Sequence, residues 1–156
     1  MNSNDAVQQA IYDSLLTEKD AMDFYCTAAL YVKNPDARRM FELLAKEERE
    51  HAEWFHRICN RIDLDEFLRL IDSGPSPDSA WLSQLDSIPD LENGELEVMK
   101  VAMRQEKDLE KELQRIADAT EDPDVRQIYE ANIASTHRHF EMISQEYNRL
   151  KELLSL

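Results

Sequence analysis

A Glu-x-x-His pair, Glu48 and His51, lies inside the stretch Arg39-Met40-Phe41-Glu42-Leu43-Leu44-Ala45-Lys46-Glu47-Glu48-Arg49-Glu50-His51-Ala52-Glu53-Trp54-Phe55. Residues three and four apart share one face of an α-helix. The face that carries this pair is otherwise apolar and reads Ala37, Phe41, Leu44, Glu48, His51, Phe55, Ile58 and Ile62. Burying a carboxylate without a partner is costly. This inward face, or seam, of the helix therefore predicts a metal ion, an ion pair or a bound proton beside Glu48.

The composition favours one all-α domain over residues 1–156. The chain has 156 residues, of which 42% are hydrophobic, and this is enough for a sizeable core. It contains only two Gly and five Pro, whereas a sheet protein with many turns would need more Gly.

The net charge of −15 argues against nucleic acid and anionic membranes as partners, and it is compatible with attracting cations. The first residues, 1–5, lack basic side chains, and no run of about 18 apolar residues occurs, so we expect a cytoplasmic protein without an export signal. Cys26 and Cys59 are isolated, which excludes a Cys-x-x-Cys metal knuckle and a disulfide framework.

Hydrophobic periodicity and helix stop signals predict four long helices. The first runs from near residues 3–5 to about 33, and the second from 35 to about 63. The third runs from about 91 or 95 to 119, and the fourth from about 124 to the C-terminus. Residues 64–71 are compatible with an extension of the second helix or with a separate one. A Ser-, Pro- and Asp-rich connection at about 72–94, with Trp81 and Leu85 among its apolar anchors, is expected to pack along the bundle.

The two halves of the chain repeat at a constant separation of 88 residues. Each half carries one acid in the seam of its first helix and one histidine in the seam of its second. The matched pairs are Glu18 with Glu106, Asn34-Pro35-Asp36 with Asp122-Pro123-Asp124, Phe41 with Tyr129, and His51 with His139. Glu48 is the exception, because its equivalent is Thr136.

Two related helical hairpins joined by a long crossover make a four-helix bundle of the one-crossover kind. In such a bundle, five side chains that can bind a metal converge at one level: Glu18, Glu48, His51, Glu106 and His139. Carboxylates and imidazoles in this combination are typical of a non-haem di-iron or di-manganese site.

The stretch from Leu16 to Tyr25, the later stretch from Phe41 to Ala52 and the repeat of both resemble the diiron domain of the rubrerythrins, in the ferritin-like superfamily. The resemblance covers about residues 5–150 and is more specific in the first half. It implies a ferritin-like bundle, a homodimer, and two iron ions, with one ion, manganese or zinc as alternatives. It also implies reduction of hydrogen peroxide or oxidation of ferrous iron, and a role in oxidative stress. The oxidant would be hydrogen peroxide or dioxygen.

Carried over to this sequence, the resemblance makes Glu18 and Glu106 terminal ligands, Glu48 a bridging ligand, and His51 and His139 the imidazole ligands. The chain departs from the family at Thr136, where a second bridging Glu is expected, and at Leu109, where rubrerythrins carry another iron-binding carboxylate. The Cys-rich rubredoxin-like segment is also absent, so electrons would come from a separate carrier protein.

The missing bridge leaves three carboxylates for four positive charges, which makes a single metal ion, or weaker binding of two, an alternative. Glu110, one turn after Glu106, is a possible substitute acid. Other polar residues have simpler interpretations: Tyr25 and Tyr129 pack in the core, His137 lies beside the seam, and Glu47, Glu50 and Glu53 form a solvated face. Two alternative functions follow, a non-catalytic module holding one ion and a metal-free structural bundle.

Overall fold

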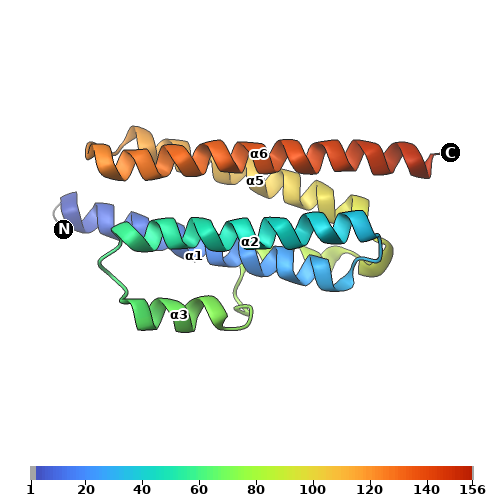
Figure 1. Cartoon of the computed structure of the whole chain (residues 1–156), viewed down its shortest axis with the longest axis horizontal. Helices are drawn as coiled ribbons and strands as arrows, with labels where there is room; N and C mark the ends of the chain where they lie inside the picture. The colour runs from blue at the N-terminus through green and yellow to red at the C-terminus, as the bar shows by residue number, and fades with distance from the viewer. Residues whose placement is uncertain (1–2, 156) are drawn as a thin grey trace.

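The computed structural model describes residues 3–155, which contain helices and no strand. Four long helices form the body: α1 (Ser3–Tyr31), α2 (Pro35–Ile58), α5 (Glu95–Asp118) and α6 (Pro123–Leu154). The helix α1 packs mainly on α2, and α5 packs mainly on α6. Each pair is an antiparallel hairpin, and α1 and α6 run in the same direction (Figure 1). The all-α fold with two hairpins and a crossover is as predicted.

The second helix of each hairpin begins in the same way. The Asn34 side chain accepts hydrogen bonds from the backbone N–H groups of Asp36 and Ala37, and the Asp122 side chain accepts one from Asp124. A proline follows each of these caps, where its missing N–H costs nothing. The repeated Pro-Asp motif therefore fixes the start of α2 and of α6 at equivalent positions.

The helix α2 ends at Ile58, five residues before the predicted end. The backbone N–H of Cys59 bonds to the His56 carbonyl and closes the last turn. The Gln8 side chain, from α1, donates to the Ile58 carbonyl and accepts from the Asn60 N–H. These contacts satisfy backbone groups that would otherwise continue the helix.

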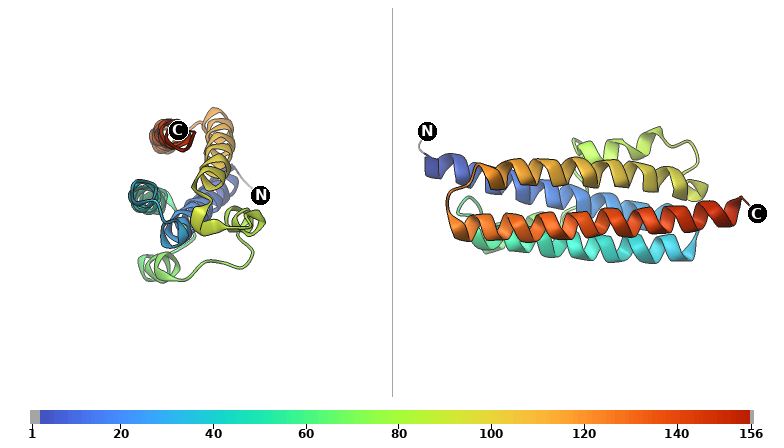
Figure 2. Two further views of the ribbon diagram at one scale, coloured as in Figure 1. Left: turned by 90° about the vertical axis from the view of Figure 1, so that its right-hand side faces the viewer. Right: turned by 90° about the horizontal axis from the view of Figure 1, so that it is seen from above.

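Residues 64–71 belong to a separate helix, α3 (Leu64–Asp72), whose first turn is capped by the Asp63 side chain. Phe67 and Ile71 are its buried residues, and the Phe67 ring stacks on the ring of His56 at 4.5 Å between centroids. Seen along the bundle, α3 lies outside the four long helices (Figure 2). It covers the α1–α2 hairpin and does not contribute to the centre of the bundle.

The crossover contains three short helical segments, α4 (Ala80–Ser83), η1 (Leu85–Ser87) and η2 (Leu91–Asn93). Trp81 and Leu85 are buried in it, as predicted. The Trp81 ring meets the rings of Phe24 and Tyr25 edge-on, at 5.6 and 6.2 Å between centroids. The crossover is therefore attached to α1 by aromatic packing.

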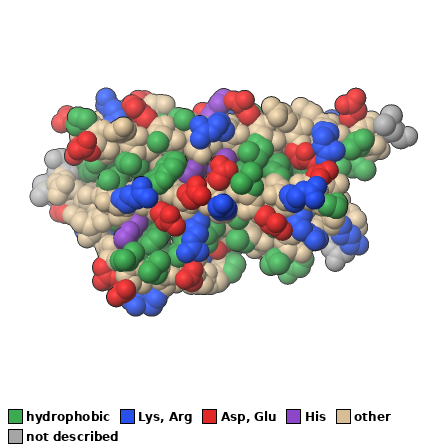
Figure 3. All heavy atoms as spheres, viewed as in Figure 1, with side chains coloured by type: hydrophobic (Ala, Val, Ile, Leu, Met, Phe, Trp, Pro, Cys, Tyr) green, Lys and Arg blue, Asp and Glu red, His purple; other side chains and the backbone are tan. Residues whose placement is uncertain are grey.

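Acidic and basic side chains are interspersed over the face that carries α2, α3 and α6, with hydrophobic side chains between them (Figure 3). Within residues 3–155, none of the helices combines the length and the apolar character needed to cross a bilayer.

Candidate metal centre

The five predicted ligands come together in the middle of the bundle, one or two from each long helix. Glu18 comes from α1, Glu48 and His51 from α2, Glu106 from α5 and His139 from α6. All are at most 1% exposed. They form two groups, Glu18 with Glu48 and His51, and Glu48 with Glu106 and His139; within each group the ligand atoms lie within 4.8 Å of one another.

Glu48 belongs to both groups and directs one oxygen at each. Its Oε1 lies 2.8 Å from Nδ1 of His139, and its Oε2 lies 3.5 Å from Nδ1 of His51. The two imidazole rings stack nearly parallel, with 5.3 Å between centroids. A carboxylate placed in this way can bridge two metal ions.

Each group is completed by one further acid. Glu18 Oε2 lies 3.5 Å from Nδ1 of His51, and Glu106 Oε1 lies 3.6 Å from Nδ1 of His139. Both imidazoles therefore present the same nitrogen to the carboxylates, and the other nitrogen is available for a supporting partner.

These supporting partners come from the opposite hairpin. Nε2 of His51 lies 2.7 Å from Oγ of Ser135, and Nε2 of His139 lies 3.4 Å from Oε1 of Glu47. A hydrogen bond from Nε2–H fixes the tautomer and leaves Nδ1 free as a ligand. The hydroxyl of Tyr25 donates to Oε1 of Glu106 at 2.6 Å.

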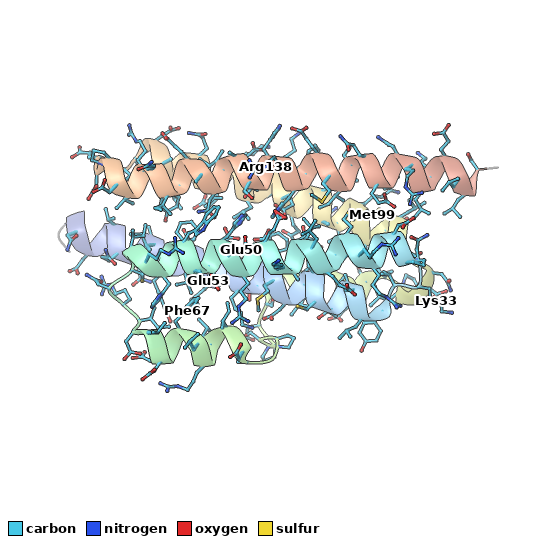
Figure 4. The ribbon with its side chains drawn as sticks, viewed as in Figure 1. Lys33, Glu50, Glu53, Phe67, Met99 and Arg138 are labelled. Carbon is cyan, nitrogen blue, oxygen red and sulfur yellow. The ribbon has the colours of Figure 1, made fainter. Side chains whose placement is uncertain are left out.

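The prediction that Glu47 belongs to a solvated face is wrong, because its side chain is only 28% exposed and contacts His139. Glu50 and Glu53 do lie on the outer side of α2 (Figure 4). Glu47 and Ser135 are 88 residues apart, so they hold equivalent places in the repeat. Extending the repeat by one position before Glu48 pairs Glu47 with Ser135, but only the structure shows that each contacts the histidine of the opposite hairpin.

Tyr25 and Tyr129 are both fully buried, and only Tyr25 contacts a candidate ligand. Tyr129 shares a hydrogen bond of 2.8 Å with Ser14 between α6 and α1. Burial raises the pKa of Tyr129 to about 12, so its hydroxyl keeps its proton. This tyrosine ties the two hairpins together, in agreement with a role in the core.

The three buried carboxyl groups differ in their affinity for protons. Burial, and then the charge of Glu48, raises the pKa of Glu18 well above its ordinary value and that of Glu106 to about 7. Burial also raises the pKa of Glu48, but the neighbouring Glu18 carboxyl group and the imidazoles of His51 and His139 outweigh it, so the pKa falls well below the ordinary value. Glu48 is therefore the carboxylate that stays ionised.

The imidazoles hold protons tightly in the metal-free protein. Burial lowers their pKa values, but the surrounding carboxylates outweigh it: chiefly Glu48 and Glu18 raise the pKa of His51 to about 10. Glu106 and Glu48 together raise the pKa of His139 to about 11. Positive charge is thus favoured at both Nδ1 positions, where a cation could replace the protons.

Several buried oxygen and nitrogen atoms that could bind a metal have no hydrogen-bond partner among the described residues. They are both oxygens of Glu18, Oε2 of Glu48, Nδ1 of His51 and Oε2 of Glu106. Buried polar atoms are normally paired, so unpaired oxygen and nitrogen atoms converging from three helices fit bound metal ions. The residues present are therefore suited to a dinuclear centre.

Within the described part of the chain, the structure brings no other acid to the two positions, Thr136 and Leu109, at which the chain departs from the family pattern. Thr136 is fully buried, and Leu109 is 6% exposed in the apolar core. Glu110 does not replace the missing acid, because its Oε1 lies 3.0 Å from Nδ1 of the half-exposed His137. His137 is turned away from the cluster and also contacts Glu141.

In a comparison with known families, the family model described as Rubrerythrin matches residues 10–147. The comparison with curated proteins and the comparison with solved structures each gave no match.

Proposed function

The chain belongs to the rubrerythrin family, and from this premise we propose that it binds two iron ions at its buried carboxylate–histidine cluster and reduces hydrogen peroxide. The observation that carries the proposal is the position of Glu48, whose two oxygens face the two histidines separately. One shared carboxylate between two otherwise separate sets of ligands favours two ions over one.

The first ion would be held by Glu18, Glu48 and His51, and the second by Glu48, Glu106 and His139. Two carboxylates and one imidazole per ion are the donor types that non-haem iron and manganese use, whereas structural zinc sites usually take four ligands rich in cysteine or histidine. The family supports iron among these metals.

Bound ferrous ions would each supply one electron, so that hydrogen peroxide, two electrons and two protons give two molecules of water. The protein's own contribution is placement and exclusion of bulk water, because every candidate ligand is buried. Tyr25 fixes one oxygen of Glu106 through its hydroxyl, and Ser135 and Glu47 orient the two imidazoles.

The test is peroxide consumption by anaerobically reduced, iron-loaded protein with an artificial electron donor. Glu48→Gln removes the shared charge with little change of shape, so we expect turnover to fall by at least about a hundredfold together with the iron content. Glu50→Gln is the matched control, because Glu50 lies two residues away on the exposed side of α2. It should keep both turnover and iron.

Equal turnover in the two variants would contradict the proposal. If wild-type protein holds two irons but consumes no peroxide, the result would support the dinuclear metal centre and contradict the proposed reduction of peroxide.

A further inference from the structure

We propose that the turn of α6 at Thr136 forms a binding place for a small exogenous carboxylate, such as formate, next to the candidate metal ligands. The inference rests on the proposed dinuclear centre and adds a ligand class to it. Its basis is a position where the internal repeat calls for a carboxylate and the chain supplies a neutral hydroxyl.

The position of Thr136 follows from the repeat and from its neighbours. Thr136 stands three residues before His139, as Glu48 stands three residues before His51. Ser135, the preceding residue, contacts Nε2 of His51 at 2.7 Å, which places this turn of α6 beside the histidine of the opposite hairpin. In the other half, Glu47 has the matching relation to Nε2 of His139, at 3.4 Å, and the residue after it, Glu48, lies 2.8 Å from Nδ1 of the same ring. By the repeat, Thr136 follows Ser135 in the same way and belongs on the Nδ1 side of His51.

Two polar atoms on this face of α6 are buried and have no hydrogen-bond partner among the described residues. They are Oγ1 of Thr136 and Oδ1 of Asn132, one turn earlier, and both residues are fully buried. The Asn132 amide nitrogen is already used, because it donates to the Ile128 carbonyl. The Thr136 hydroxyl can therefore donate to a carboxylate oxygen that approaches the centre.

Charge balance favours an anion at this place. Glu18, Glu48 and Glu106 bring three negative charges, whereas two divalent ions bring four positive ones. Glu110 does not correct the difference because it pairs with His137, and Glu47 lies on the outer, Nε2 side of His139. An uncompensated charge in a buried site is costly, so a monovalent anion stabilises the loaded centre.

The size of the missing group limits the anion. The Thr136 side chain is two heavy atoms shorter than a Glu side chain and lacks the carboxyl group that the repeat calls for. Formate supplies that group alone, and a bulky carboxylate such as benzoate should not fit.

The test measures the affinity of the full chain for Mn²⁺, by electron paramagnetic resonance of the free ion, in sodium formate and in sodium chloride of equal ionic strength. Manganese(II) keeps its oxidation state in air, so binding is separated from turnover. We expect formate to tighten binding of the two ions by about tenfold, a modest coupling between neighbouring sites. Benzoate should act like chloride.

Two variants at one position separate charge from occupied space. Thr136→Glu supplies the carboxylate covalently, so metal binding should tighten in chloride and no longer respond to formate. Thr136→Gln fills the same space without the charge, so binding should neither tighten nor respond. Circular dichroism of each metal-free variant checks that it is folded.

Two ions bound with equal affinity in formate and chloride would overturn the inference and leave the proposed function intact. A formate response that survives in folded Thr136→Gln would also overturn it, because the anion would then bind elsewhere. Failure of wild-type protein to bind two ions in either salt would overturn both proposals. The wild-type comparison decides the matter even where a variant does not fold.

Discussion

Glu48 is the residue on which the cluster depends. A fully buried carboxylate is stable only when opposite charge lies close to it, and in the metal-free protein this charge is supplied by the protons of His51 and His139. Metal ions need the same Nδ1 atoms in their deprotonated form. Metal binding at this centre would therefore exchange protons for metal ions, and the stability of the metal-free protein and the metal affinity should depend on pH in opposite ways.

The stability of the metal-free protein should fall as the pH rises from 6.5 to about 10, the range between the ordinary and the raised pKa of His51. The pKa of Glu106 is raised from 4.5 to about 7, and those of His51 and His139 from 6.5 to about 10 and about 11. A group with a raised pKa in the folded state stabilises that state fully below its unfolded pKa. This stabilisation is lost as the pH rises through the folded value, so the histidine contribution declines above pH 6.5.

Bound metal should counteract this loss, since binding requires the same protons to leave. We therefore expect the increase in Tm caused by Mn²⁺ to be larger at about pH 8 than at about pH 6. Thermal unfolding with and without the ion at both pH values measures this difference. An increase in Tm that does not change with pH, or that shrinks as the pH rises, would show that the ion does not displace these protons.

The sequence predicted the five residues that meet at the centre, but it missed Ser135 and Glu47, which contact the two histidines. Helical periodicity places Glu18, Glu48 and His51 on inward faces, and the repeat adds Glu106 and His139. Glu47 was misassigned because it lies at the edge of the seam, where periodicity does not separate partly buried from exposed positions. Its contact with His139 depends on how α2 and α6 are rotated relative to each other.

Among the elements, α3 was the one that periodicity could not assign. Residues 64–71 are amphipathic, which suits both a continued α2 and a separate helix. The break arises from the side chain of Gln8, which binds the end of α2 from a distant part of the chain, and from the Asp63 cap. A long-range contact of this kind leaves no periodic signal.

The helix α3 should contribute to stability without affecting the metal centre, because it packs outside the four long helices (Figure 2). Phe67 is 3% exposed and lies on the side of α3 that faces α2 (Figure 4). We expect Phe67→Ala to lower the free energy of unfolding by about 3 kcal/mol, measured by urea denaturation, with metal content unchanged.

Leu68→Ala is the matched control on the same helix, since Leu68 is 42% exposed, and it should cost less than about 0.5 kcal/mol. Loss of metal in folded Phe67→Ala would show that α3 supports the centre after all.

The whole molecule is a repeated hairpin whose two copies have diverged at the centre. The repeat predicted the pairing of helices, the matched caps and the level at which the ligands meet, because a constant separation preserves both the helical face and the position along the bundle. It also located the asymmetry: Glu47 and Glu48 in one half are Ser135 and Thr136 in the other. The structure adds that Glu48, the acid that has no counterpart in the other half, belongs to both groups of candidate ligands.

The most direct test of the central claim is the metal content of the chain, measured by elemental analysis on protein expressed with iron and purified without chelators or a chelating column. The arrangement of Glu48 between two sets of ligands predicts two metal ions per chain, mainly iron. One ion per chain, or none, would contradict a dinuclear centre.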